Sequence, residues 1–139
     1  MILILDFGHD WLAFGAVEGG KSHWRRVAAG TSAFRAWRRV QREFGCDRRS
    51  PTGVAVVLRE RREGAPPVPW STVRQAVAMG NTLAFAWGAP VAAVVAPAGE
   101  KPEALAVLAV QALAKAKTGD WVQAAYSGEP HITQPKKLQ

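Results

Sequence analysis

Short apolar segments separated by turn residues run through the whole chain. Five segments predict strands, of which the first, apart from Asp6 at its end, and the fourth and fifth are continuously apolar and therefore buried. These segments are 2–6, 11–17, 21–28, 53–58 and 90–96. Gly19 and Gly20 predict a tight hairpin turn between the second and third. The third segment carries the most charge, which suits an exposed sheet edge.

Three longer segments show a helical period or helix end signals. Residues 32–44 place apolar side chains three or four apart between arginines, which predicts an amphipathic helix. Residues 72–87 predict a second helix, which Gly88 ends before Pro90. Residues 102–117 predict a third helix.

The order of these elements is β-β-β-α-β-α-β-α. Strands joined by hairpins are antiparallel, whereas strands joined through helices are parallel, so the order predicts a mixed five-stranded sheet with helices on both faces. This α/β arrangement is typical of the ribonuclease H-like folds, which include the actin-like ATPase (ASKHA) superfamily. We expect one domain over residues 1–125 and an extended C-terminal tail over 126–139.

Charge is unevenly distributed. The net charge is +7, and residues 21–50 hold nine basic side chains against two acidic ones. Such a cluster indicates either a nucleic-acid contact or a solvated arginine-rich surface. The candidate nucleic-acid contacts are Arg35, Arg38, Arg39 and Arg42. The single cysteine, Cys46, has the positive neighbours Arg42, Arg48 and Arg49, which can lower a thiol pKa, but it lacks a nearby base or a second cysteine and is interpreted as a bystander.

No apolar run is long enough to cross a membrane, so we expect a cytoplasmic protein without membrane contact.

Asp6 is the main candidate for chemistry, because it ends the first strand, where a metal or phosphate site would begin. A two-metal nuclease needs several converging carboxylates, and few acidic residues stand at matching places. A phosphate-binding loop is also missing, because "APPVPWST" is rich in prolines, which have no N–H to donate. We therefore expect no catalysis, metal or cofactor, and Asp6 accepting hydrogen bonds from backbone or hydroxyl groups. The alternative is a ribonuclease H-like nuclease or Holliday-junction resolvase using Asp6 and Mg²⁺.

Both central helices carry more apolar surface than one small sheet can cover, which predicts a protein partner. Small residues recur every four positions in the second helix and allow close approach of another helix. The candidate interface residues are Ala33, Phe34, Trp37, Val40, Arg74, Val77, Gly80, Asn81 and Ala84.

Three stretches resemble the TsaB (YeaZ) family, the companion subunit in the biosynthesis of threonylcarbamoyladenosine (t6A) in tRNA. "STVRQAVAMGNTLAFAWGAPVAAV" is similar to the family signature at Arg74, Asn81, Leu83, Ala84, Gly88, Pro90 and Val91. The opening "ILILDFGHDWLAFGAVEGGK" resembles the first hairpin of the family, and "YSGEPHITQPKK" its C-terminal stretch. The turn that precedes the signature helix departs from the family, since Pro66 to Ser71 replace its glycine-rich sequence.

The resemblance implies a non-catalytic subunit that forms a heterodimer with a TsaD-like threonylcarbamoyltransferase through the two central helices. It also implies a TsaE-like ATPase as a further partner and an indirect contact with tRNA. When the chain is alone, we expect a homodimer through the same helices.

Overall fold

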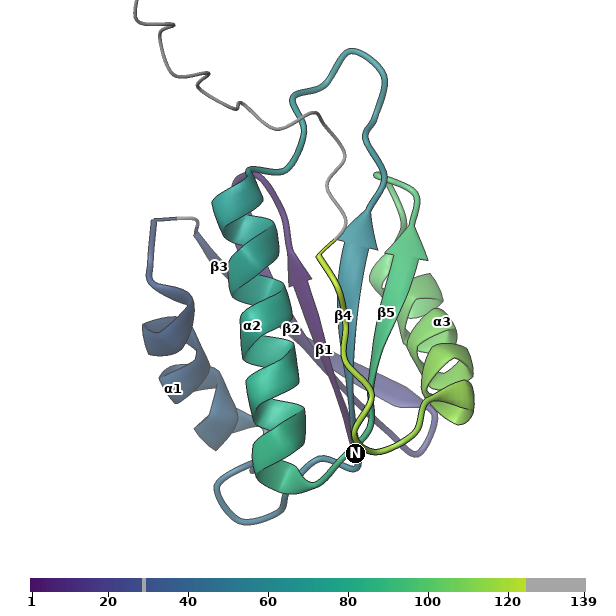
Figure 1. Cartoon of the computed structure of the whole chain (residues 1–139). Helices are drawn as coiled ribbons and strands as arrows, with labels where there is room; N and C mark the ends of the chain where they lie inside the picture. The colour runs from purple at the N-terminus through teal and green to yellow at the C-terminus, as the bar shows by residue number, and fades with distance from the viewer. Residues whose placement is uncertain (29, 125–139) are drawn as a thin grey trace, which may run out of the picture.

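The computed structural model describes residues 1–28 and 30–124, and its element order confirms the predicted one. The strands pair in the order β3-β2-β1-β4-β5 (Figure 1). The elements are β1 (Ile2–Phe7), β2 (Trp11–Glu18), β3 (Lys21–Ala28), α1 (Ala33–Glu43), β4 (Gly53–Arg59), α2 (Trp70–Trp87), β5 (Val91–Ala96) and α3 (Pro102–Lys115). Among the described residues, no helix is long and apolar enough to cross a membrane.

The sheet is mixed, as the sequence predicts. β1 pairs antiparallel with β2, and β2 with β3, whereas β4 runs parallel to both β1 and β5. Gly19 and Gly20 form the hairpin turn with φ of 58° and 75°, values that glycine adopts without steric cost. Because β1, β4 and β5 are parallel, their carboxyl ends lie together at one end of the sheet, and Asp6 lies there.

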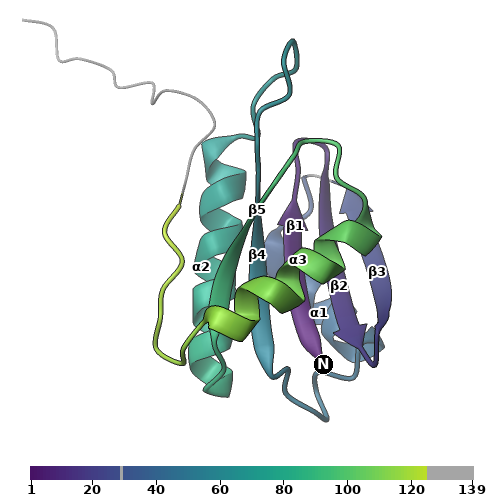
Figure 2. The same ribbon diagram turned by 90° about the vertical axis from the view of Figure 1, so that its right-hand side faces the viewer.

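Two helical layers cover the sheet. α1 and α2 lie on one face and α3 on the other, as the two orthogonal views show (Figures 1 and 2). Side chains of β1 alternate between the layers, since Leu3 and Leu5 belong to the core beneath α1 and α2, whereas Ile4 packs beneath α3. The buried strands therefore form the middle of a three-layer α/β/α sandwich.

α2 packs unusually close to the sheet at Gly80. A Cβ atom at this position would lie 2.3 Å from Cγ2 of Val56 in β4, so only glycine fits there. Ala76 and Ala84, one turn before and after, are also buried. The stripe of small residues that predicted close approach of another helix thus serves the contact between α2 and its own sheet.

Helix ends follow local chemistry. The side chain of Ser32 caps α1 by accepting a hydrogen bond from the N–H of Arg35 at 3.2 Å. α2 begins at Trp70, two residues before the predicted start, because the carbonyl of Pro69 accepts from Thr72 and Val73. Gly88 ends α2 in the left-handed conformation, as predicted.

After α3 the chain returns along α2. The side-chain amide of Asn81 pairs with the backbone of Val122, donating to its carbonyl and accepting from its N–H, both at 3.0 Å. Val122 is buried in the core beneath α2. The tail predicted for 126–139 lies outside the described residues.

Candidate functional site

Asp6 forms a buried ion pair with Arg59 at the carboxyl ends of β1 and β4. The guanidinium donates two parallel hydrogen bonds to the carboxylate, from Nε to Oδ1 at 2.9 Å and from Nη2 to Oδ2 at 2.8 Å. The side chains of Asp6 and Arg59 are only 4% and 10% exposed. The negative charge of Asp6 is thus neutralised within the fold, and both of its oxygens are occupied.

The remaining donors of Arg59 fix the loop after β5. They bind three carbonyl oxygens, those of Pro97 at 3.3 Å, Ala98 at 2.7 Å and Glu100 at 3.2 Å. The hydrogen bond to Asp6 raises the pKa of Arg59 above its usual value, so the guanidinium stays charged. Arg59 therefore ties together β1, β4 and the loop that leads into α3.

Trp11 covers this ion pair from the start of β2. Its ring lies 5.4 Å from the guanidinium carbon of Arg59 and 4.4 Å from that of Arg26, which belongs to β3. Both arginines gain a cation–π contact with the indole. Gly8 is needed beside the ring, because a Cβ there would lie 2.7 Å from Cε2 of Trp11.

This geometry corrects one sequence prediction, since Asp6 accepts from a guanidinium rather than from backbone or hydroxyl groups. Sequence reasoning missed Arg59, although its place at the end of the neighbouring parallel strand was the available signal. Within residues 1–28 and 30–124, no group of three or more histidine, cysteine, aspartate or glutamate residues could hold a metal ion. The ion pair and the hydrogen bonds of Arg59 link β1, β4 and the loop after β5. They do not support the alternative of a Mg²⁺-dependent nuclease.

Most of the predicted partner-interface residues belong to the core. Six are buried, namely Ala33, Trp37, Val40, Val77, Gly80 and Ala84. Trp37 shows the reason, since its ring contacts Phe14 of β2 and Trp87 of α2 at centroid distances of 6.0 and 5.9 Å. We therefore correct their assignment, because a side chain that fills this chain's own core is hidden from a partner.

The other three predicted interface residues reach the surface to different degrees. Phe34 is 66% exposed on α1, and Arg74 is exposed on α2. Asn81 is half-buried, and its amide is committed to Val122.

The outward side of α2 was missed by the sequence analysis. Ala78, Thr82 and Ala86 follow one another at helical spacing and are all exposed, and Gln75 extends the same line. We call Gln75, Ala78, Thr82 and Ala86 the α2 ridge. A helix rich in apolar residues on all sides does not reveal which side faces the sheet, so the periodicity alone could not separate the ridge from the buried stripe.

The arginines proposed for nucleic-acid contact lie on the outer side of α1. Arg35, Arg38, Arg39 and Arg42 are all exposed. Two other basic residues of this region form surface ion pairs, Arg25 with Glu43 and Arg49 with Glu18. The structure therefore brings the four candidates together on one helix, and none of them is buried.

Cys46 follows α1 and is buried. Burial, followed by the charge of Asp47, raises the pKa of its thiol from 9.0 to about 11. The neighbouring arginines do not lower the pKa of this thiol below its usual value, because desolvation of the thiolate outweighs their attraction.

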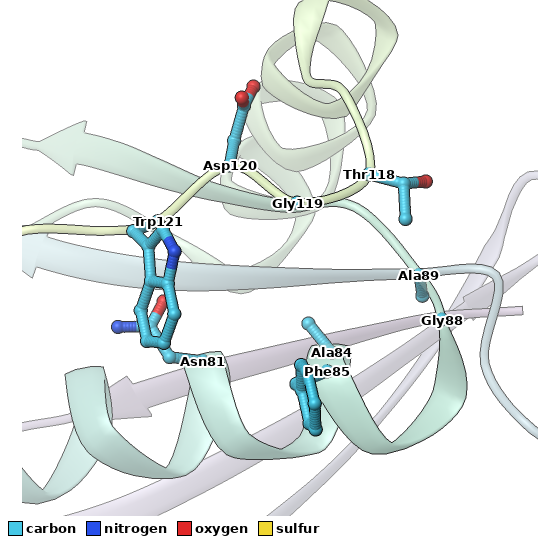
Figure 3. A pocket seen from close by; sticks show the side chains of 9 residues that line it. All are labelled: Asn81, Ala84, Phe85, Gly88, Ala89, Thr118, Gly119, Asp120 and Trp121. Atoms are coloured by element: carbon cyan, nitrogen blue, oxygen red, sulfur yellow. The ribbon is translucent and has the colours of Figure 1, made fainter.

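A hollow of about 370 Å³ lies between the end of α2 and the segment after α3 (Figure 3). Phe85 and Trp121 border it and are 83% and 74% exposed, while Ala84 and Ala89 form part of its apolar lining. Phe85 lies next to the α2 ridge and extends the exposed apolar surface of that helix.

Comparison with known proteins identifies the fold. No family profile and no curated protein sequence matches the chain. Two solved structures are similar at a TM-score of 0.51: YeaZ from Pseudomonas aeruginosa, with 22% identity, and an uncharacterized protein with similarity to peptidase YeaZ from the same organism, with 24% identity. The chain has a YeaZ-like fold. A structure of RuvC from Thermus thermophilus is similar at a TM-score of 0.45, with 22% identity over 68% of this chain and 63% of that one.

The likeness to YeaZ is partial. It covers 68% of this chain but only 43% and 42% of the two YeaZ-like structures. It places the five-stranded sheet and its helices among the ribonuclease H-like folds, as the element order predicts. The fold alone does not assign an activity, so function has to be argued from the site and the surface.

Proposed function

We propose that this chain is a non-catalytic subunit that pairs with a TsaD-like protein in the t6A modification of tRNA. The observation that carries the proposal is the buried ion pair of Asp6 and Arg59 within a YeaZ-like fold. Arg59 binds both carboxylate oxygens of Asp6, the residue from which a metal site at this end of the sheet would start. The sequence similarity of "STVRQAVAMGNTLAFAWGAPVAAV" to the TsaB signature supports the same role.

The pairing surface that we propose is the outer side of α2, together with the exposed Phe34 of α1. The α2 ridge gives a smooth line of small side chains, and close helix contacts favour such residues because the backbones can then approach. Phe85 supplies exposed aromatic area beside it, and Phe34 supplies exposed aromatic area on α1; aromatic side chains of this kind dominate interface energies. Arg74, which the family signature contains, adds a polar contact at the start of α2.

Co-purification with a TsaD-like protein tests this surface. Ala86→Glu puts a charge on the ridge at an exposed position, so the monomer keeps its fold while an apolar contact would bury an unpaired carboxylate. We expect loss of complex formation at micromolar concentration. Val77→Glu is unsuitable, because Val77 is buried and the variant would test folding.

Gln111→Glu on the opposite face is the matched control, since it adds the same charge at an exposed helical position. It should pair as the unmodified chain does. Failure of the unmodified chain to bind any TsaD-like protein would exclude the proposed function, whereas binding that survives Ala86→Glu would exclude only the proposed surface.

Two further roles follow from the same proposal. The exposed arginines of α1 lie outside the proposed α2 surface, and we propose that they contact the tRNA held by the complex. A TsaE-like ATPase would join the assembled pair rather than the single chain. With these partners we also propose a cytoplasmic location.

A further inference from the structure

The hollow at the end of α2 differs in charge from the rest of this basic chain, whose net charge is +7. Its volume of about 370 Å³ is large enough for one small ligand or one long side chain. Among the described residues that line it, Asp120 alone is charged, because Lys115 and Lys117 precede this stretch and do not line the hollow. A cation is therefore the kind of charged group that the hollow favours.

The carboxylate of Asp120 makes no ion pair with a basic side chain of the described residues. Its Oδ2 accepts a hydrogen bond from the backbone N–H of Lys117 at 3.0 Å. Figure 3 shows the carboxylate on the rim, pointing away from the Trp121 ring. Its charge thus attracts a cation toward the hollow while the space beside the ring stays open.

The end of α2 adds to the negative potential. The backbone dipoles of a helix give its C-terminus the equivalent of about half an elementary negative charge, which favours a cation there. α2 has no basic residue in its last turn, whereas α3 has Lys115 in its own. No basic side chain of α2 therefore offsets its dipole where Gly88 and Ala89 border the hollow.

Two strongly exposed aromatic rings border the same space. Phe85 is 83% and Trp121 is 74% exposed. Neither ring contacts a cation of the described residues, whereas Trp11 elsewhere in the chain packs against Arg26 at 4.4 Å. The faces of indole and phenyl rings attract cations. A planar guanidinium stacks on such rings and is more weakly hydrated than an ammonium group, so the site suits arginine better than lysine.

We propose that this hollow binds a guanidinium group, and that an arginine side chain of the protein paired with the α2 ridge supplies it. The hollow flanks the ridge, because Phe85 lines the hollow and is next to Ala86 of the ridge. A partner that lies along the ridge reaches the hollow with one long side chain, and arginine is enriched at protein interfaces. The partner as the source of the guanidinium rests on the proposed function, whereas the binding site itself does not.

Titration of the full chain with N-acetyl-arginine amide tests the site without a partner. The NMR shifts of the Gly88 and Gly119 amides report binding at constant ionic strength, since both residues line the hollow. We expect saturation with a dissociation constant of roughly millimolar size. The citrulline analogue has nearly the same shape without the charge and should bind at least about fivefold more weakly. The leucine analogue should bind as weakly as the citrulline analogue.

Variants of the lining locate the binding. Trp121→Leu and Phe85→Leu should each weaken arginine-amide binding about threefold, because they keep an exposed apolar side chain but remove an aromatic face. Asp120→Asn should weaken it and reduce its dependence on salt. Phe34→Leu is the matched control, since it makes the same change at an exposed position of α1 and should not alter the titration.

Thermal melts should show that these variants remain folded. A titration without saturation overturns the site, and so does equal binding of the citrulline or leucine analogue. Arginine-amide binding that Trp121→Leu and Phe85→Leu leave unchanged overturns it as well.

Pairing measurements separate this inference from the proposed function. Trp121→Leu should weaken pairing with a TsaD-like protein at least about threefold. Arginine-amide binding without any pairing would exclude the proposed function and the partner as the source, but not the guanidinium site. Pairing without arginine-amide binding would overturn the site alone. Pairing that Trp121→Leu leaves unchanged would overturn the partner's arginine as the occupant.

Discussion

Arginine has opposite roles in two regions of this molecule. At the carboxyl end of the sheet, Arg59 is almost fully buried and binds a carboxylate and three carbonyls. On the outer side of α1, four arginines stand in solvent. The first region needs its charge to complete the fold, whereas the second leaves its charges available to another molecule. The net charge of a sequence counts buried and exposed arginines alike, and only their burial in the structure shows which role each one has.

Removing Arg59 should have the largest effect on stability. Arg59→Met leaves the Asp6 carboxylate buried without a partner, and breaking a buried ion pair from one side costs about 3–5 kcal/mol of unfolding free energy. Urea unfolding of both proteins measures the loss. Arg38→Met, an exposed position, is the matched control and should change stability by no more than ~0.5 kcal/mol. Similar losses in the two variants would contradict a special role for the buried arginine.

Replacing both members of the pair sharpens the same point. Asp6→Leu combined with Arg59→Met removes the unpaired charge as well, so the double variant should be more stable than Arg59→Met alone. Full recovery is not expected, because the carbonyls of Pro97, Ala98 and Glu100 lose their donor, at about 0.5–1.5 kcal/mol for each hydrogen bond. A double variant whose loss equals the sum of both single losses would show that the two side chains do not interact.

The sequence predicts the fold well because the relevant signals are local. The three apolar strands, the Gly19–Gly20 turn and the stop at Gly88 each depend on neighbouring residues, and the mixed sheet follows from their order. The start of α2 was missed by two residues, since Ser71 and Thr72 are good caps by type while the carbonyl of Pro69 satisfies the first helical N–H groups.

The candidate site was harder to predict because it depends on contacts between distant residues. Arg59 and Asp6 are 53 positions apart in the sequence, and the signal for their contact is their place at the ends of neighbouring parallel strands rather than any local motif. The stripe of Ala76, Gly80 and Ala84 was recognised as a packing surface, but its partner is Val56 of the sheet and not another protein. The small residues thus predicted a close contact of α2, and only the three-dimensional structure shows that this contact is with the sheet.

Cys46 lies between the two extremes, as a buried thiol close to a cationic surface. Its pKa is raised from 9.0 to about 11 in the folded chain, so the unfolded chain loses the thiol proton first as the pH rises. The protonated Cys46 thiol therefore contributes its full share to the unfolding free energy below about pH 9, and this contribution is lost between about pH 9 and 11. Unfolding free energy should therefore fall more steeply over this window in the unmodified chain than in Cys46→Ala.

Other groups titrate in the same window, so the informative quantity is the difference between these two proteins. Parallel curves would show that the thiol is not protected by the fold. Slow reaction of native Cys46 with a thiol reagent at pH 8, and fast reaction after unfolding, is the independent check.

The arginines of α1 should give the smallest effect on stability and the clearest effect on binding. Changing Arg35, Arg38, Arg39 and Arg42 together to glutamine removes four exposed charges, each worth no more than ~0.5 kcal/mol to the fold. If these side chains neutralise phosphates, tRNA affinity should drop, and the slope of log affinity against log salt should decrease by roughly 0.7–0.9 for each phosphate that is no longer neutralised. The matched control changes Arg61, Arg62, Lys115 and Lys117 to glutamine and removes the same net charge elsewhere. An equal drop of tRNA affinity in both variants would assign the attraction to overall charge, and a drop confined to the α1 variant would locate it on the helix that sequence analysis proposed.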